Sequence, residues 1–299
     1  ITQDFGTHKA SRRLFQTAFK RSALEGYVDI MNPTIQENIA GWADEKDFRY
    51  TVWSRKILID VGARVFFGTE PDGEEIRQIA NLFHEMNHVG LMALMHWNIP
   101  GTKYWRGQRG KRKMEELIMR TIHARREKPG KDLTSILAAD RDDDGELWPA
   151  DLLLPHLNLL LFAAHDTTAG ATSHLMMYLS QPENLHLQEK LREQAFDLGI
   201  ENPSLSDLDA YTDMEHAVLE ALRKHPAVTT IMRRTTRDVR IGDRDIPADT
   251  MLFNMAHWAH HSPEFWTDPQ RFPVSHFEDR LGQPAGRRAP GGRAAVCVP

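Results

Sequence analysis

The sequence predicts a mainly α-helical fold with a small β region in the last third of the chain. Apolar residues recur at helical spacing through residues 1–226. Strand-like alternation replaces that period over residues 227–256, and repeated prolines interrupt residues 257–299. We therefore expect one domain over residues 1–299, with a helical body, a small β region and a loop-rich end.

The composition is that of a globular chain with a sizeable core. The chain has 299 residues, 41% of them hydrophobic, and a net charge of −5, which gives no overall case for nucleic-acid binding. A single cysteine, Cys297, rules out an intrachain disulfide. Neither a leader pattern nor a run of about 18 apolar residues is present, so we expect a cytoplasmic monomer with no membrane segment in this chain. A membrane anchor would have to lie in residues that precede it.

One long apolar stretch, residues 152–172, organises the helical body. Leucine surrounds its first half on nearly every side, and a helix that is apolar all round is buried. We expect this helix to begin near Pro149. Its polar positions, which include Asn158, His165 and Asp166, argue against a membrane span.

The middle of this helix changes from leucine to small and polar side chains. Ala163 and Ala164 leave room beside the helix, and Asp166, Thr167 and Thr168 follow them. An ionisable group in a core needs a partner, so this segment indicates a wall of a ligand cavity. Two structural alternatives stay open: the threonines bond back to carbonyls four residues earlier, and Asp166 is partly exposed at an end.

Further helices are predicted on both sides of this stretch. His8 and Arg12 are four residues apart, so they share one face, which either holds an anion or is a solvated basic face. The other expected helices cover residues 1–31, 33–43, 48–67, 73–94, 105–126, 183–198 and 204–223.

The expected strands follow the last of these helices. They cover residues 228–236, a strand–turn–strand unit over 239–247, and residues 251–255. Just before them, Glu220 and Arg223 lie three residues apart and can pair on one helix face. Taken alone, such a pair is an ordinary surface ion pair of little worth.

A second pattern suggests a different class of enzyme. His84, Glu85 and His88 form an H-E-x-x-H match, which on a helix places two imidazoles and a carboxylate on one side, as in zinc peptidases. Leu91 occupies the position where the extended pattern has glycine, and nothing singles out a third ligand. A zinc metallohydrolase is therefore an alternative function.

Five ordered motifs resemble the cytochrome P450 family of haem-thiolate monooxygenases. Residues 163–168 (Ala-Ala-His-Asp-Thr-Thr) resemble its oxygen-activating helix motif, with Ala164 where glycine is usual. Residues 220–226 match its E-x-x-R segment, and residues 268–277 resemble the meander that follows, with His276 where arginine is usual. Residues 6–12 resemble a helix whose basic residues hold a haem propionate, and Cys297 stands where the haem ligand is expected.

The resemblance implies a truncated P450 fold, haem b as cofactor, and a role for each motif residue. Cys297 would ligate the haem iron as a thiolate, and Asp166 and Thr167 would order water and relay protons. Glu220 and Arg223 would pair inside the fold and, with His276, fix the loop that presents the cysteine. The remaining haem contacts implied are His8, Arg12, Ala163, Ala164, Arg233 and Arg293.

The implied reaction inserts one oxygen atom from O2 into a lipophilic substrate, by hydroxylation or epoxidation. Electrons would come from NAD(P)H through a ferredoxin or flavoprotein reductase, because this chain has no nucleotide-binding or flavin-binding fingerprint. Residues 99–103 weakly resemble the branch of the family that acts on retinoids and sterols.

The cysteine loop departs from the family pattern. Pro290, Arg293 and Ala295 stand where phenylalanine, glycine and a basic residue are usual, and Pro299 ends the chain two residues after Cys297. We therefore expect a family member that is incomplete at both its N- and C-terminal ends. A catalytically silent, truncated P450 fragment without haem is the second alternative.

Overall fold

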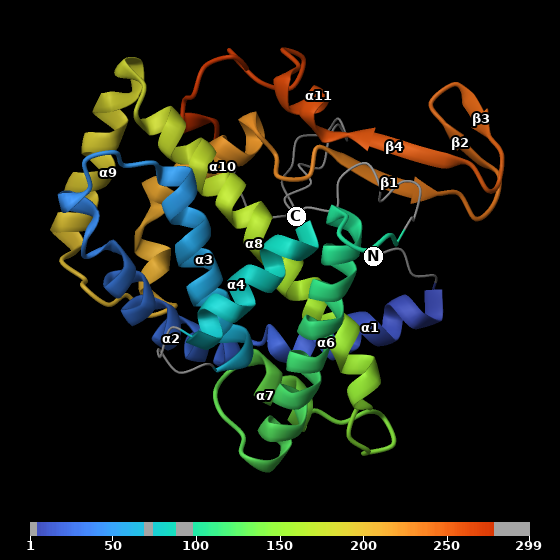
Figure 1. Ribbon diagram of the computed structural model, residues 1–299. Coiled ribbons are helices and arrows are strands. Elements are labelled where there is room, and N and C mark those ends of the chain that lie inside the picture. The colour runs from blue at the N-terminus through green and yellow to red at the C-terminus, as the bar shows by residue number, and fades with distance from the viewer. Residues whose placement is uncertain (1–4, 69–73, 88–97, 278–299) are drawn as a thin grey trace. The chain divides into compact units, whose positions relative to one another are not determined.

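The computed structural model describes residues 5–68, 74–87 and 98–277 (Figure 1). The chain divides into two compact units. The first comprises Ile1–Ala169 with Glu201–Leu208, and the second comprises Gly170–Ile200 with Asp209–Pro299. The single domain expected from the sequence stays a prediction.

The regular elements of the first unit are helices within its described residues, as the apolar spacing predicts, and one isolated bridge joins Arg141 and Leu147. Helix α8 begins in this unit and continues into the second. The elements are α1 (Phe5–Ala18), α2 (Arg21–Ile39), the 3₁₀ turn η1 (Trp42–Asp44), α3 (Tyr50–Phe67), α4 (Glu74–Asn87), α6 (Lys103–Glu127), α7 (Leu133–Ala139) and α8 (Ala150–Leu179).

The second unit combines short helices with two small sheets. Strand β1 (Thr230–Arg234) pairs antiparallel with β4 (Met251–Met255), and β2 (Val239–Ile241) forms a hairpin with β3 (Arg244–Ile246). The change of period after residue 226 is therefore confirmed. The helical elements are η2 (Pro182–Asn184), α9 (Leu185–Leu198), η3 (Asp207–Ala210, at the junction of the units), α10 (Thr212–Lys224) and α11 (Ala256–His261).

Helix α8 supplies a central stripe of the core in the first unit. Leu153, Leu157 and Leu161 are buried, each one turn beyond the last. Helix α3 comes so close at Gly62 that a β-carbon there would lie 3.4 Å from a methyl carbon of Leu161. The prediction of a buried helix from residues 152–172 is thus confirmed for its leucine-rich half. Every helix in the described part of the chain is too short or too polar to cross a membrane.

Two helix boundaries near the N-terminus differ from those predicted. The expected helix over residues 1–31 is broken before Arg21, because Lys20 is extended, with φ −66° and ψ 152°. The expected start at Pro33 is also wrong, since α2 continues through Pro33 to Ile39. Buried Ala23, Tyr27 and Val28 anchor α2 by packing, which outweighs the local helix-breaking tendency of proline.

Gly68 closes α3 in a left-handed conformation, with φ +62°. A β-carbon there would collide with the Arg125 guanidinium and lie 2.7 Å from Asp132 Oδ2. We expect Gly68→Ala to lower the free energy of unfolding by about 2 kcal/mol or more, from backbone strain and this collision. Urea unfolding followed by circular dichroism measures the change. Gly26→Ala is the control. Gly26 lies inside α2 with open space around it, so alanine there should raise the free energy of unfolding by about 0.5–1 kcal/mol. Equal midpoints for the two variants would contradict this account.

Candidate functional site

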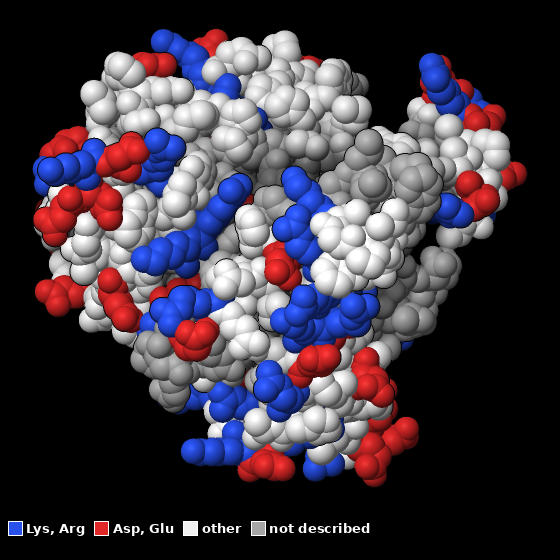
Figure 2. Space-filling view, viewed as in Figure 1, with Lys and Arg blue, Asp and Glu red and all other residues white. Residues whose placement is uncertain are grey.

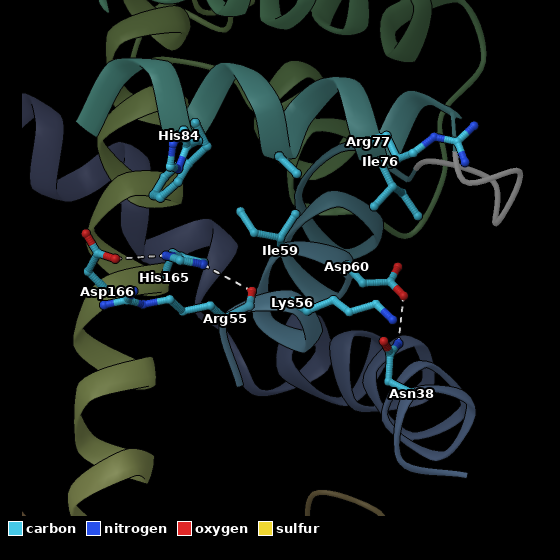
Figure 3. Close-up of a pocket in the computed structure, with 12 residues that line it drawn as sticks. Asn38, Arg55, Lys56, Ile59, Asp60, Ile76, Arg77, His84, His165 and Asp166 are labelled. Atoms are coloured by element: carbon cyan, nitrogen blue, oxygen red, sulfur yellow. Dashed lines mark hydrogen bonds and ion pairs between the residues drawn. The ribbon is translucent and has the colours of Figure 1, made fainter. Parts of the chain in front are cut away.

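A cavity of about 500 Å³ opens in the first unit among α2, α3, α4 and α8 (Figure 3). Its apolar wall includes Ile59 from α3, and Ile76 and Phe83 from α4. His165 and Asp166 reach it from α8. Of the residues predicted to form a wall of a ligand cavity, Asp166 lines this cavity, together with its neighbour His165.

His165 and Asp166 form the polar end of this cavity. The imidazole is buried, and its Nδ1 lies 3.0 Å from Asp166 Oδ1. Its Nε2 lies 3.2 Å from the backbone oxygen of Arg55 on α3. The Asp166 side chain is 52% exposed, so only one side of the carboxylate is taken up by the imidazole.

Asn38 and Asp60 line the cavity from α2 and α3, and Asp60 takes part in an ion pair and a hydrogen bond. Asp60 accepts hydrogen bonds from Arg64 Nε at 2.8 Å and from Asn38 Nδ2 at 2.7 Å, so its charge is compensated within α2 and α3. The Arg55 and Lys56 side chains add positive charge to the cavity wall. Figure 2 shows further Lys and Arg side chains over α6, whose first turns carry Lys103 and Arg106. The surroundings of the cavity are therefore basic.

The other predicted residues of α8 lie outside the cavity lining. Ala163 and Ala164 are exposed on the helix and leave an uncovered strip of small side chains. The Thr167 hydroxyl donates to the carbonyl of Ala163 at 2.6 Å, which is the back-bonding alternative that the sequence left open. The acid faces the cavity, whereas the neighbouring hydroxyl is held by its own helix.

Only part of the predicted haem-binding set can be placed. Arg12 is exposed on α1 in the first unit, and Arg233 on β1 of the second donates to the carbonyl of Met232 at 2.8 Å. Arg293, Cys297 and the His8 side chain lie outside the described residues. The uncovered strip of small residues on α8 and the cation of Arg12 fit a flat apolar group that carries carboxylates.

A buried ion pair lies at the centre of the second unit. Glu220 Oε2 accepts from Arg223 Nε at 2.8 Å and Oε1 from Nη2 at 2.7 Å, and the two side chains are 0% and 1% exposed. His276 Nδ1 lies 3.2 Å from both carboxylate oxygens, and its Nε2 lies 2.6 Å from Thr267 O. The three residues singled out for structural pairing therefore meet in one cluster.

This cluster ties α10 to the chain that follows α11. Arg223 also donates to the carbonyls of His260, Pro269 and Arg271. Lys224, also buried, donates to the carbonyls of Pro269 and Gln270, and burial lowers its pKa. Two side chains of one helix thus satisfy carbonyls in the last turn of α11 and in residues 269–271, which have no regular structure of their own.

Three histidines of the second unit make its stability depend on pH. Burial, the largest cause, lowers the pKa of His225, His260 and His261. The unfolded chain then binds protons more readily than the folded unit, so protonation of these histidines favours unfolding. The free energy of unfolding is therefore highest above about pH 6.5 and decreases as the pH falls below it. We expect the urea midpoint to fall between about pH 7.5 and 5.5 more in the parent chain than in a variant with glutamine at all three positions. Equal pH dependence in both would contradict this assignment.

Sequence reasoning did not single out several residues that the structure brings to these sites. Arg55 and Lys56 line the cavity, and Trp266 packs its ring 5.0 Å from the Arg223 guanidinium. The register of buried leucines on α8 is the signal that points to His165, because it places residue 165 on the core side. The arginine and tryptophan contacts join distant segments, and no local pattern indicates them.

The zinc pattern finds no support in the structure. His84 and Glu85 lie on α4, whereas His88 lies outside the described residues. Within residues 5–68, 74–87 and 98–277, no group of three His, Cys, Asp or Glu side chains is arranged to hold a metal ion.

Comparisons with known proteins agree with the motifs. A Mycobacterium tuberculosis protein described as "Putative cytochrome P450 136" is 29% identical over 281 residues, which cover 92% of this chain and 56% of the relative. "Abscisic acid 8'-hydroxylase 2" of Arabidopsis thaliana is 26% identical over 278 residues, covering 91% of this chain and 57% of that protein. The chain therefore spans just over half the length of these relatives.

A solved structure shares the fold. The protein described as "Retinoic acid bound cyanobacterial CYP120A1" superposes with a TM-score of 0.81 at 23% identity, covering 95% of this chain and 65% of that one. The sequence profile of the family described as "Cytochrome P450" matches residues 1–289, which include α8, the Glu220–Arg223 pair and the meander. The mainly helical body, the buried cluster behind the E-x-x-R motif and this match establish that the chain belongs to the cytochrome P450 family.

Proposed function

We propose that the protein is a haem-thiolate monooxygenase that inserts one oxygen atom from O2 into a lipophilic substrate. The family match over residues 1–289 carries this proposal. The geometry of the described residues supports it, because an acid, Asp166, lies partly exposed in the middle of the buried helix α8. An acid in that setting can hold a proton and deliver it to a reaction beside the helix.

The haem b that the family uses would be held by residues from several parts of the chain. Cys297 would supply the thiolate, and Arg12, Arg233, Arg293 and His8 would neutralise the propionates. Bound haem would supply the site for O2 and the electron density, pushed from the thiolate, that favours cleavage of the O–O bond. The family match ends at residue 289, before Cys297, so the assignment of the ligand depends on the experiment below.

The chain's own residues would provide protons and keep the site in place. Asp166 would hold a proton on its carboxylate and pass it on, and Thr167 would order a water molecule once its hydroxyl leaves the Ala163 carbonyl. Glu220, Arg223 and His276 would act structurally, by fixing the segment that leads to the cysteine loop. None of these three would touch the substrate.

We further infer an isoprenoid-type substrate and a separate electron donor. Relatives are described as hydroxylases of abscisic acid and taxanes and as a monooxygenase of cyclooctat-9-en-7-ol, and the matching solved structure holds retinoic acid. All are lipophilic molecules, and residues 99–103 resemble the retinoid and sterol branch. Electrons would come from NAD(P)H through a ferredoxin or flavoprotein reductase, in the cytoplasm.

The decisive experiment is the spectrum of the haem-reconstituted, dithionite-reduced protein under carbon monoxide. We expect a strongly red-shifted Soret band, and its loss in Cys297→Ser, because the band reports thiolate ligation. A band typical of imidazole ligation would overturn the role of Cys297. Absence of haem uptake would favour the silent-fragment alternative.

A further inference from the structure

A histidine stands in the leucine register of α8. Leu153, Leu157 and Leu161 form the buried stripe at intervals of four, and His165 takes the next position with 6% exposure. Its ring packs edge-on against Phe83 of α4, with centroids 4.5 Å apart. Burying an imidazole is costly unless its two nitrogens find partners. Its hydrogen bonds therefore decide what this position does.

These hydrogen bonds require one more proton than a neutral histidine and an ionised aspartate hold between them. The Arg55 carbonyl can only accept, so Nε2 of His165 carries a hydrogen. If Nδ1 were bare and Asp166 ionised, two lone pairs would face each other across 3.0 Å. A proton between Nδ1 and Oδ1 removes that repulsion, whether it belongs formally to the ring or to the carboxyl group.

Another histidine on the same helix provides an internal comparison. His156, equally buried, has Nδ1 2.6 Å from the Leu152 carbonyl and Nε2 2.8 Å from the Ser11 hydroxyl. A hydroxyl can donate or accept, so the two hydrogen bonds of His156 need only one ring proton. The environment of His165 differs in having a carboxylate where His156 has a hydroxyl.

His276 in the second unit has the same kinds of partner, but its carboxylate is inaccessible to solvent. It also lies between a carbonyl and a carboxylate, but Glu220 is fully buried and paired with Arg223. A proton shared there is structural. Asp166 instead has an exposed carboxylate that opens on a cavity, so its proton can leave and be replaced.

The cavity beside the pair is lined by charged side chains, and its cations are exposed to solvent, which screens them. Asp60 is already compensated by Arg64 and Asn38. The charged or titratable groups that line the cavity are Arg55, Lys56 and Asp60 from α3, Arg77 and His84 from α4, and His165 and Asp166 from α8.

We propose that His165 and Asp166 share one proton, that Asp166 releases it from its exposed side, and that a proton from bulk solvent, carried by water in the cavity, replaces it. On release, the proton between Nδ1 and Oδ1 leaves, and His165 remains neutral with its hydrogen on Nε2. A proton that arrives from bulk solvent along water in the cavity then goes between the facing lone pairs and restores the pair, so no hydroxide is left behind. His165 is a positioning residue that keeps Asp166 loaded. This role rests on the proposed function, because the acceptor of the proton is the oxygen chemistry of that reaction.

The shared proton itself is tested without haem or activity. The chain is labelled with ¹⁵N at histidine, and the ring nitrogens are observed by NMR at about pH 7, with His165→Asn and His156→Asn to assign the signals. We expect both nitrogens of His165 to carry or share a proton, and His156 to show one protonated and one bare nitrogen. In Asp166→Asn, the amide can donate to Nδ1, which should become bare. A bare Nδ1 in the parent chain overturns the proposal.

The relay role needs a second measurement on the haem-loaded protein. Asparagine at 165 can still donate to Asp166 but holds no removable proton. We therefore expect His165→Asn to keep the haem spectrum and to lower the product formed per NAD(P)H consumed by roughly ten-fold. His156→Asn, normalised to bound haem, should leave this ratio unchanged. An unchanged ratio in His165→Asn overturns the relay role. Failure of the parent chain to take up haem counts against the proposed function alone, since the NMR result stands independently.

Discussion

Replacing Glu220 by alanine is expected to lower the free energy of unfolding by about 3–5 kcal/mol, the largest effect that the structure predicts for one substitution. The carboxylate is fully buried and accepts two hydrogen bonds from Arg223, whose side chain is 1% exposed. Alanine would leave a buried guanidinium without its counter-ion and would also remove the partner of His276 Nδ1. The measurement is urea unfolding followed by circular dichroism, with aggregation as the expected outcome if the variant does not fold.

The control for this prediction is an exposed ion pair in the same unit. Arg240 and Asp245 lie 3.0 Å apart on the β2–β3 hairpin, with side chains 64% and 80% exposed. Arg240→Ala should change stability by less than about 1 kcal/mol, because solvent screens the pair. If Glu220→Ala unfolded at the same urea concentration as Arg240→Ala, the buried pair would have no structural role.

The Glu220 cluster also shows that residue spacing predicts an ion pair but does not predict whether the pair is buried. The interval of three residues predicts that Glu220 and Arg223 share a helix face, and they do. The same spacing is typical of surface pairs, and burial comes here from Trp266, Pro269 and Arg271, more than 40 residues away. The resemblance to a family supplied the expectation of burial, which the local pattern does not contain.

In the fold as well, features with a local cause could be predicted from the sequence, whereas features that depend on distant contacts could not. Long periodic segments such as 48–67 and 105–126 are helices close to their predicted bounds, because their apolar stripes pack on the core. The break before Arg21 and the helix through Pro33 were not predicted, since packing of α2 decides both. Helix α7 is short, and its position depends on a buried aspartate rather than on periodicity.

The candidate site was predictable in its acid but not in its environment. Asp166 is a visible anomaly in an apolar run, whereas the partner of His165 on α3 is a backbone carbonyl, which carries no sequence signal. The basic cavity wall combines Arg55 and Lys56 of α3 with residues of α4. Only the packing of three helices brings these groups together.

Asp132→Ala is expected to have the second largest effect, a loss of about 2–4 kcal/mol of stability. The Asp132 carboxylate is buried and caps α7: Oδ1 accepts from the backbone N–H of Ser135 at 2.9 Å, and Oδ2 from the Ser135 hydroxyl at 2.7 Å. Arg125 of α6 reaches within 3.0 Å of Oδ2 and donates to the carbonyls of Phe67 and Gly68 at the end of α3. Asp132 and Arg125 together therefore join the ends of three helices.

A capping residue that has no ion pair serves as the control for Asp132. It shows how much stability a helix loses when only the cap is removed. Thr102 caps α6 by accepting from the backbone N–H of Trp105 at 3.2 Å on an exposed surface, so Thr102→Ala should cost about 1 kcal/mol. Asp132→Asn keeps an oxygen for the Ser135 N–H but loses the negative charge, so its cost should lie between those of the two alanine variants. Urea unfolding of the three variants gives the free energy of unfolding that each substitution removes. If Asp132→Ala cost no more than Thr102→Ala, the Arg125 contact would add nothing. Because Asp132→Asn removes the charge and leaves the capping geometry, its own cost measures what the charge contributes at the junction of α3, α6 and α7.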